Sequence, residues 1–248
     1  MIHNLIRRVA AKAHYTSAQR CTDWSGEQVA ALKPQVLLDV GCGDGNLLFK
    51  YLGYKPQRFC GVEAVPGLRQ KAAEKGIECV AVDLNGVWPY PDNTFDVVHS
   101  AQVIEHLHNT RLFVQETLRV LKPGGTAIIT SENLTSFINL GAMALGYTPF
   151  SLIRVCGWYL GNPLGLHYKE ELEEEGISVT DPAFAGVSGH VRVLSVLQAQ
   201  ELLERVGFAR AEVSSMGLIP LPDWLGRKLE RWMFRRGHFL LIRARKPA

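Results

Sequence analysis

The sequence predicts an α/β fold, in which helices cover both faces of a mostly parallel β-sheet. Val36–Val40 is an apolar run interrupted only by Asp39, which is typical of a parallel strand buried on both faces. Glycines at three alternate positions follow this run, and a helical pattern follows the glycines. Short apolar runs then alternate with helical patterns as far as residue 131, which favours a parallel sheet with crossover helices.

The glycines after the first strand indicate a binding site. Gly41, Gly43 and Gly45 let the backbone turn sharply and let a ligand approach where a Cβ would clash. The helix that follows would offer its free N–H groups and the positive end of its dipole. We therefore expect a nucleoside-like ligand at the carboxyl end of the sheet.

The glycine spacing does not match a dinucleotide site. In that fingerprint the third glycine stands three residues after the second, but here that position is Asn46 and the third glycine comes early. The carboxylate of Asp39 at the strand end would repel a pyrophosphate, whereas it suits a cationic ligand such as the amino-acid part of S-adenosylmethionine. A nicotinamide-dependent dehydrogenase is therefore disfavoured.

Residues 39–45, Asp-Val-Gly-Cys-Gly-Asp-Gly, resemble motif I of the class I S-adenosylmethionine-dependent methyltransferases. Residues 88–96, Trp-Pro-Tyr-Pro-Asp-Asn-Thr-Phe-Asp, and residues 121–125, Leu-Lys-Pro-Gly-Gly, are similar to stretches of the ubiquinone/menaquinone-like (type 11) members. The resemblance covers residues 36–131 and resumes at 190–208. It implies an enzyme with a Rossmann-like seven-stranded, mostly parallel sheet and a cap insertion after the fifth strand.

The resemblance also implies the cofactor, S-adenosyl-L-methionine, and its product S-adenosyl-L-homocysteine. Glu63, at the end of the second strand, would take both ribose hydroxyls, because one carboxylate accepts two hydrogen bonds from a vicinal diol. Asp83 would bind the adenine amino group, and Leu84 would pack on the adenine ring. The alternative for Glu63 and Asp83 is that each is an ordinary surface acid. The expected cofactor-binding residues are Asp39, Gly41, Gly43, Gly45, Glu63, Asp83, Leu84, Ser100 and Gln102.

An alcohol or sugar acceptor would need a general base. His106 is the first candidate, because it follows the fourth strand at the rim that faces the methyl group and related enzymes place a histidine in that region. His167 and His190 flank the cap and are second candidates. The alternative for His106 is that it only caps or orients its loop. No acid cluster accompanies His106 and His108, so we expect no metal.

Four regions are expected: a helical lid over 1–34, a cofactor-binding core over 35–132, a substrate cap over 133–189, and the rest of the core over 190–248. Helical spacing in the lid predicts one helix over 2–13 and a short one over 26–32. Residues 134–153 carry no charge, but Asn139, Gly141 and Gly146 interrupt them. We therefore predict a cap rather than a membrane span, with an interface element as the alternative.

A basic amphipathic helix is predicted from Leu221 to Arg236. Its apolar residues share one face at helical spacing: Leu221, Trp224, Leu225, Leu229, Trp232 and Met233. Such a helix can lie on an anionic membrane; the alternative is a helix packed on the fold with its basic side in water. The five cysteines form no C-x-x-C pair, which favours reduced thiols in a cytoplasmic protein, with peripheral contact at the inner membrane surface as the alternative.

The predicted function is methyl transfer to oxygen on a small-molecule or glycan acceptor. Aromatic residues of the cap, such as Phe137 and Tyr147, suit a flat, amphipathic or sugar acceptor, and residues 135–165 are similar to bacterial methyltransferases of surface glycans. A net charge of +3 does not imply nucleic acid. The alternatives are a membrane-associated lipid or quinone methyltransferase and, from another class, a non-catalytic cofactor-binding regulator or scaffold.

Overall fold

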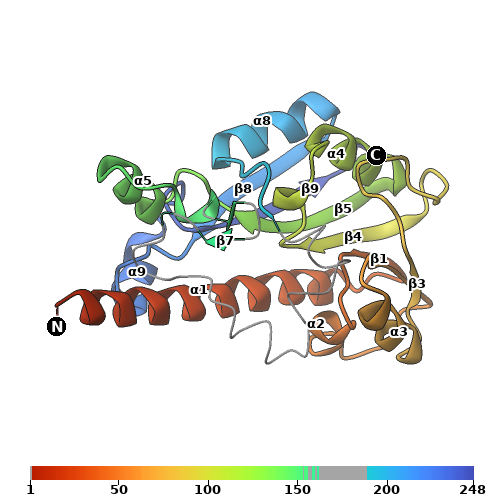
Figure 1. Cartoon of the computed structure of the whole chain (residues 1–248). Coiled ribbons are helices and arrows are strands. Elements are labelled where there is room, and N and C mark those ends of the chain that lie inside the picture. The colour runs from red at the N-terminus through yellow and green to blue at the C-terminus, as the bar shows by residue number, and fades with distance from the viewer. Residues whose placement is uncertain (1, 153, 156–157, 160, 162–188) are drawn as a thin grey trace.

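The computed structural model describes residues 2–152, 154–155, 158–159, 161 and 189–248. Its centre is a seven-stranded sheet in the order β3-β2-β1-β4-β5-β9-β8 (Figure 1). The sheet is mostly parallel, and β9 runs antiparallel to both of its neighbours. The expected Rossmann-like fold is confirmed. The strands are β1 (Val36–Val40), β2 (Arg58–Val62), β3 (Glu78–Val80), β4 (Phe95–Ala101), β5 (Leu121–Glu132), β8 (Arg210–Met216) and β9 (Phe239–Arg245).

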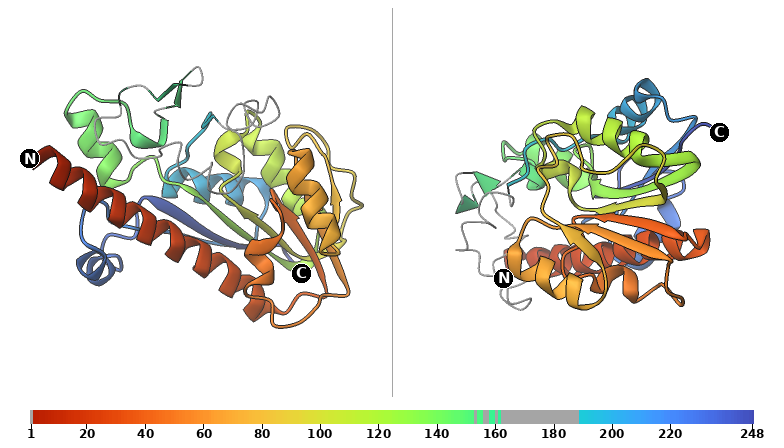
Figure 2. Two further views of the ribbon diagram at one scale, coloured as in Figure 1. Left: turned by 60° about the horizontal axis from the view of Figure 1, so that its bottom comes forward. Right: turned by 90° about the vertical axis from the view of Figure 1, so that its right-hand side faces the viewer.

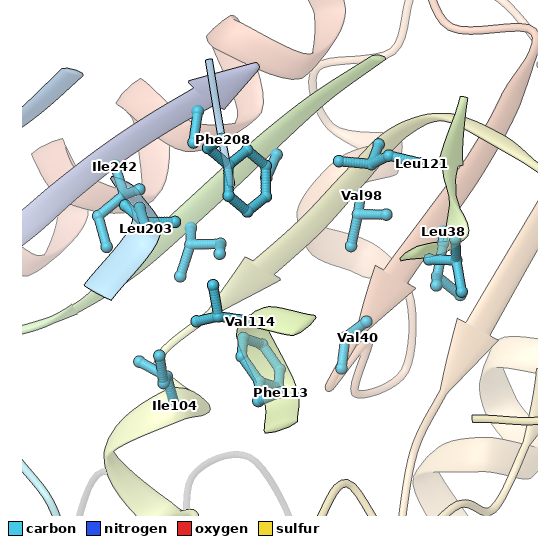
Figure 3. Packing of buried hydrophobic residues seen from close by; sticks show 14 of the residues in the cluster. Leu38, Val40, Val98, Ile104, Phe113, Val114, Leu121, Leu203, Phe208 and Ile242 are labelled. Atoms are coloured by element: carbon cyan, nitrogen blue, oxygen red, sulfur yellow. The ribbon is translucent and has the colours of Figure 1, made fainter. Parts of the chain in front are cut away.

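Helices cover both faces of the sheet (Figure 2). One layer holds α1 (Ile2–Leu32), α2 (Asn46–Phe49) and α3 (Pro66–Glu74); the other holds α4 (Thr110–Val120) and α8 (Val196–Val206). Successive residues of β1 point to opposite faces. Leu37 packs with Leu48 of α2, while Leu38 belongs to the larger cluster that includes Phe113 of α4 and Leu203 of α8 (Figure 3).

The N-terminal region is one helix of 31 residues rather than the expected two. No proline or glycine stands between residues 14 and 25, so nothing in the local sequence ends the first helix. Buried Ala10, Cys21 and Val29 hold successive parts of α1 against the rest of the fold. The role of residues 1–34 as a lid stays a prediction.

The helix expected over 221–236 is shorter: α9 spans Asp223–Leu229. Leu225 and Leu229 are half-buried, but Trp224 is 65% exposed and Trp232 is 73% exposed. The prediction that the leucines and tryptophans share one face is therefore wrong. The chain turns after Leu229 because it must return to β9.

The region after β5 contains α5 (Phe137–Ala144), a 3₁₀ turn over Phe150–Leu152, and a small sheet of β6 (Arg154–Val155) and β7 (Trp158–Tyr159). Ser136 caps α5 by accepting a hydrogen bond from the backbone N–H of Asn139. Ile138 and Ala142 of α5 pack with Ala10 and Ala13 of α1. Among the helices that the structure describes, none is long and apolar enough to span a bilayer.

Candidate active site

The glycine loop after β1 is closely packed on one side and open on the other. A Cβ on Gly41 would lie 2.4 Å from Cγ2 of Val103, and one on Gly45 would lie 2.5 Å from Cδ1 of Ile77. A Cβ on Gly43 would meet no atom of the described residues within 4 Å. All three glycines have positive φ values, between 55° and 82°, which side-chain-bearing residues rarely adopt. The side of the loop at Gly43 therefore has the space that the predicted ligand requires.

Glu63 joins the glycine loop to the end of β2. Its Oε2 accepts a hydrogen bond from the Gly43 N–H at 2.9 Å, and its Oε1 accepts one from the Val65 N–H at 2.8 Å. The side chain is buried. Because each carboxylate oxygen has a second lone pair, Glu63 can still accept hydrogen bonds from a diol beside the loop. Its position fits the expected ribose contact.

Asp39 lies at the same edge of the sheet, in the strand before the loop. Its Oδ1 is 2.7 Å from Nδ1 of His99, and both side chains are buried. The two residues pair across β1 and β4 in register. His99 was not among the site residues predicted from the sequence, although a histidine inside the short apolar strand that contains Val97 and Val98 could have indicated it.

Asp83 and Leu84 follow β3, whose carboxyl end lies at the edge that also carries Asp39 and Glu63. Oδ1 of Asp83 accepts hydrogen bonds from the backbone N–H of Asn85 at 2.9 Å and from its side-chain amide at 3.1 Å. Asp83 is exposed, and Leu84 packs partly on the core. Their expected contacts with adenine stay predictions.

Ser100 and Gln102 occupy the end of β4. The Ser100 hydroxyl donates to the Val40 carbonyl at 3.0 Å, which ties β4 to β1. Gln102 has a φ of 54°, a left-handed conformation that is uncommon outside glycine. Its side-chain amide lies 3.3 Å from Oγ1 of Thr130 and 3.1 Å from Oε1 of Glu105. A non-glycine residue held there at an energetic cost is common at functional sites.

The fold brings two of the three expected catalytic histidines together. The rings of His106 and His190 meet edge to face with their centroids 4.8 Å apart. Nδ1 of His106 lies 3.2 Å from the Gly189 carbonyl oxygen, and Nδ1 of His190 lies 2.8 Å from that of Ser151. His167, the third candidate, lies outside the described residues.

Two buried carboxylates, which the sequence analysis did not single out, stand beside these histidines. Oε2 of Glu105 accepts a hydrogen bond from the Ser131 hydroxyl at 2.9 Å, and burial raises the pKa of Glu105 to about 7. Oε2 of Glu132 is 3.6 Å from Nδ1 of His190, and its Oε1 is 3.8 Å from Nε2 of His238. Glu132 ends β5, so the signal was again an acid at a strand's carboxyl end.

Within the described residues, two groups of side chains have the composition of a metal site, with all ligand atoms within 4.8 Å of one another. They are His14 with Glu132 and His238, and Glu105 with His106 and His190. No metal was expected from the sequence because no acid cluster accompanies His106 and His108, but the fold places His190 beside Glu105 and His106. Two imidazoles and a carboxylate can hold a transition metal. Metal independence stays a prediction, and chelation tests it.

Comparison with known proteins agrees with the fold and the loop. Residues 38–129 match the family model described as a methyltransferase domain. The chain is 37% identical over 113 residues to ajmaline N-methyltransferase of Rauvolfia serpentina, covering 40% of this chain and 37% of that protein. It is 32% identical over 119 residues to the mitochondrial ubiquinone biosynthesis O-methyltransferase of Rattus norvegicus, covering 44% and 33%. The chain thus matches less than half the length of either relative.

A solved structure extends the likeness in fold to almost the whole chain. It is an S-adenosylmethionine-dependent methyltransferase of Thermotoga maritima, described as a possible histamine N-methyltransferase, with a TM-score of 0.54 and 18% identity over 98% of both chains. The fold is thus that of the class I S-adenosylmethionine-dependent methyltransferases. Residues 38–129 resemble a methyltransferase domain, a family whose members use S-adenosylmethionine as cofactor.

Proposed function

We propose that this chain transfers a methyl group from S-adenosylmethionine to an oxygen atom of a small-molecule or glycan acceptor. The observation that carries the proposal is the contact between the rings of His106 and His190, next to the end of β4. The loop after β4 packs on the glycine loop, with Val103 against Gly41. A proton acceptor therefore stands close to the site that fits the cofactor. When bound, the cofactor supplies an electrophilic methyl group on a sulfonium sulfur.

The residues at the carboxyl edge of the sheet fit this cofactor. The open space beside Gly43 leaves room for the ligand, and Glu63 already receives the Gly43 N–H, so the loop is held ready for binding. We assign the ribose to Glu63, the amino-acid part to the Asp39 end of the loop, and adenine to Asp83 and Leu84. These assignments rest on the positions of the residues after β1, β2 and β3.

His106 is proposed to accept the proton of the acceptor hydroxyl. Its Nδ1 faces the Gly189 carbonyl, which can only accept a hydrogen bond, so the neutral ring carries its proton on Nδ1 and leaves Nε2 as the basic atom. A hydroxyl needs such a base more than a neutral amine does, because an amine is already a nucleophile. This is why we favour oxygen, although the relatives include an N-methyltransferase and an O-methyltransferase by name.

A lipid or quinone acceptor is the second candidate. One relative is named for ubiquinone biosynthesis, and exposed tryptophans lie beside basic residues around α9. This candidate shares the cofactor site and the proposed base with the first, so the two differ only in the acceptor. The experiment must therefore read the chemical nature of the methylated product.

The test uses S-adenosylmethionine carrying a labelled methyl group, the purified chain and extract of the source organism, followed by phase partition and size fractionation. Label in the aqueous fraction supports a glycan or small-molecule acceptor, and label in the organic phase supports the lipid or quinone candidate. Mass spectrometry of the product identifies the methylated atom, and N-methylation contradicts the proposal. Binding of S-adenosylhomocysteine with no transfer to any fraction favours a non-catalytic regulator.

A further inference from the structure

The segment around α9 presents exposed aromatic side chains and cations together. Trp232 is 73% exposed, Trp224 is 65% exposed and Phe234 is 41% exposed. We call these three residues, with the cations beside them, the basic aromatic surface. Its cations are Arg227, Lys228, Arg231, Arg235 and Arg236.

The acidic residues of this segment form ion pairs with α1 and not with the segment's own cations. Residues 219–236 contain two acids, Asp223 and Glu230, against the five cations. Both acids pair with Arg20 of α1, with N–O distances of 2.9 Å and 2.7 Å. Oε1 of Glu230 also accepts the Gly217 N–H at 2.8 Å. Among the described residues, no carboxylate forms an ion pair with any of the five cations. The exposed side of the segment therefore carries charge of a single sign.

Each exposed ring of the surface lies under a cation from its own neighbourhood. Nζ of Lys228 lies 5.5 Å from the centre of the Trp224 ring, and Cζ of Arg231 lies 5.0 Å from that of Trp232. Cζ of Arg235 lies 5.1 Å from the centre of the Phe234 ring. Amphipathic rings beside long basic side chains are the composition found where a protein meets lipid headgroups. The rings can enter the interface while the cations contact phosphate.

A depression gives this surface an apolar component. It is open to solvent and is lined by Phe137 of α5 together with the chain from Trp232 to Arg236. The backbone N–H of Phe137 donates to the Arg236 carbonyl at 3.1 Å, so the two segments are joined. In Figures 1 and 2, α5 and α9 lie at the end of the molecule that holds the N-terminal part of α1. The surface is thus displayed at one end of the fold.

We propose that the basic aromatic surface docks on an anionic lipid membrane, with Trp224, Trp232 and Phe234 at the headgroup level. The charge is complementary to anionic lipid, and aromatic rings prefer the membrane–water interface. Membrane docking of this kind does not depend on methyl transfer or on the identity of the acceptor. The segment around α9 then has two roles. Its leucines and its two acids attach it to the fold, and its exposed rings and cations face outward.

Vesicle sedimentation with the full chain tests the proposal. The probes are vesicles of phosphatidylcholine alone and of phosphatidylcholine with about one third phosphatidylglycerol, at low and at high salt. We expect binding to the anionic vesicles at low salt, a blue shift of tryptophan fluorescence, and substantially weaker binding at ~1 M salt, where the Debye length falls to about 3 Å. Equal binding to both vesicle types, or to neither, overturns the proposal.

Two variants assign the binding to this surface. Arg231→Glu with Arg235→Glu should weaken binding to anionic vesicles by roughly tenfold or more, because each cation near such a surface contributes about fivefold. Trp224→Ala with Trp232→Ala should weaken binding and remove the fluorescence shift. Matched controls are Arg111→Glu on α4 and Leu197→Ser on α8, both exposed and far from α9 in Figure 1.

Binding of S-adenosylhomocysteine should be unchanged in every variant, which shows that the fold is intact. If the surface variants bind vesicles as the controls do, the proposal is wrong. If the chain sediments with double-stranded DNA at the same salt but not with anionic vesicles, the surface serves nucleic acid and the proposal is again wrong.

Discussion

The carboxylate of Asp39 and the imidazole of His99 lie 2.7 Å apart across two neighbouring strands, and both are buried. Asp39 stands two residues before Gly41, so this contact fixes the strand end from which the glycine loop departs. Nε2 of His99 has no hydrogen-bond partner in the described part of the chain. His99 is therefore held mainly by Asp39, and Asp39 by His99.

Removing one member of this pair should destabilise the protein. His99→Leu leaves the buried Asp39 carboxylate without its neighbour, and we expect the free energy of unfolding to fall by about 3 kcal/mol or more. The double variant with Asp39→Leu should lose less than the sum of the two single changes, since two apolar side chains can pack together. Urea denaturation measures all four proteins, and simple additivity would contradict the coupling.

Loss of either carboxylate at the glycine loop should abolish cofactor binding. Asp39→Ala and Glu63→Ala should each weaken S-adenosylhomocysteine binding by about a hundredfold or more, because charge-assisted hydrogen bonds are the strongest in such sites. Titration calorimetry makes the measurement, with the exposed Asp92→Ala as the matched control. If both variants bind normally, our cofactor assignment is wrong.

Substitution of the proposed base should slow turnover without affecting cofactor binding. His106→Ala should lower the turnover rate by roughly 10²–10⁴-fold, the usual contribution of a positioned base, and remove the acidic limb of the pH–rate profile. The control is His108→Ala, two residues away and exposed. Unchanged turnover in the His106 variant would remove this residue as the base.

Stability should decrease as the pH rises through the range in which Glu105 titrates. The pKa of Glu105 is raised from 4.5 to about 7 by burial, so between these values the folded protein keeps a proton that the unfolded chain has lost. The free energy of unfolding should fall by about 3 kcal/mol across this range. Glu105→Gln should flatten the dependence and the exposed Glu27→Gln should not, as thermal or urea melts at several pH values can show.

Chelation should leave methyl transfer unchanged if His106 acts as a simple base. Incubation with EDTA, followed by desalting and assay with the labelled cofactor, makes the test. A loss of activity that zinc, manganese or magnesium restores would contradict metal independence. In that case the group of Glu105, His106 and His190 would be the first place to look, because two imidazoles and a carboxylate suit such ions.

Much of the fold could be predicted from local patterns. The run before Gly41 and the acids Glu63 and Asp83 mark strand ends, and the carboxyl ends of parallel strands meet at one edge of a sheet. The acids that follow successive strands along the chain therefore lie at the same edge of the sheet. For α1 the local pattern predicted two helices where the structure has one. Buried polar residues such as Ser17 and Ser25 interrupt the apolar pattern of this continuous helix.

Contacts between distant residues could not be predicted in this way. Periodicity placed the leucines and tryptophans around α9 on one face, but Arg20, about two hundred residues earlier, pairs with Asp223 and Glu230 and fixes the segment. Helical spacing describes which side chains are neighbours within one helix. It does not say what packs against that helix or where the chain must turn to join the next strand.

The sequence by itself determined the fold class, the glycine loop and the acids at the strand ends, because each is encoded in residues close together along the chain. Only the tertiary structure decided that His106 meets His190, that Asp39 faces His99, and that Glu105 is buried beside them. These pairs join residues dozens of positions apart. These contacts, and the burial that raises the pKa of Glu105, arise only when distant segments pack together. They cannot be predicted from any one segment of the sequence.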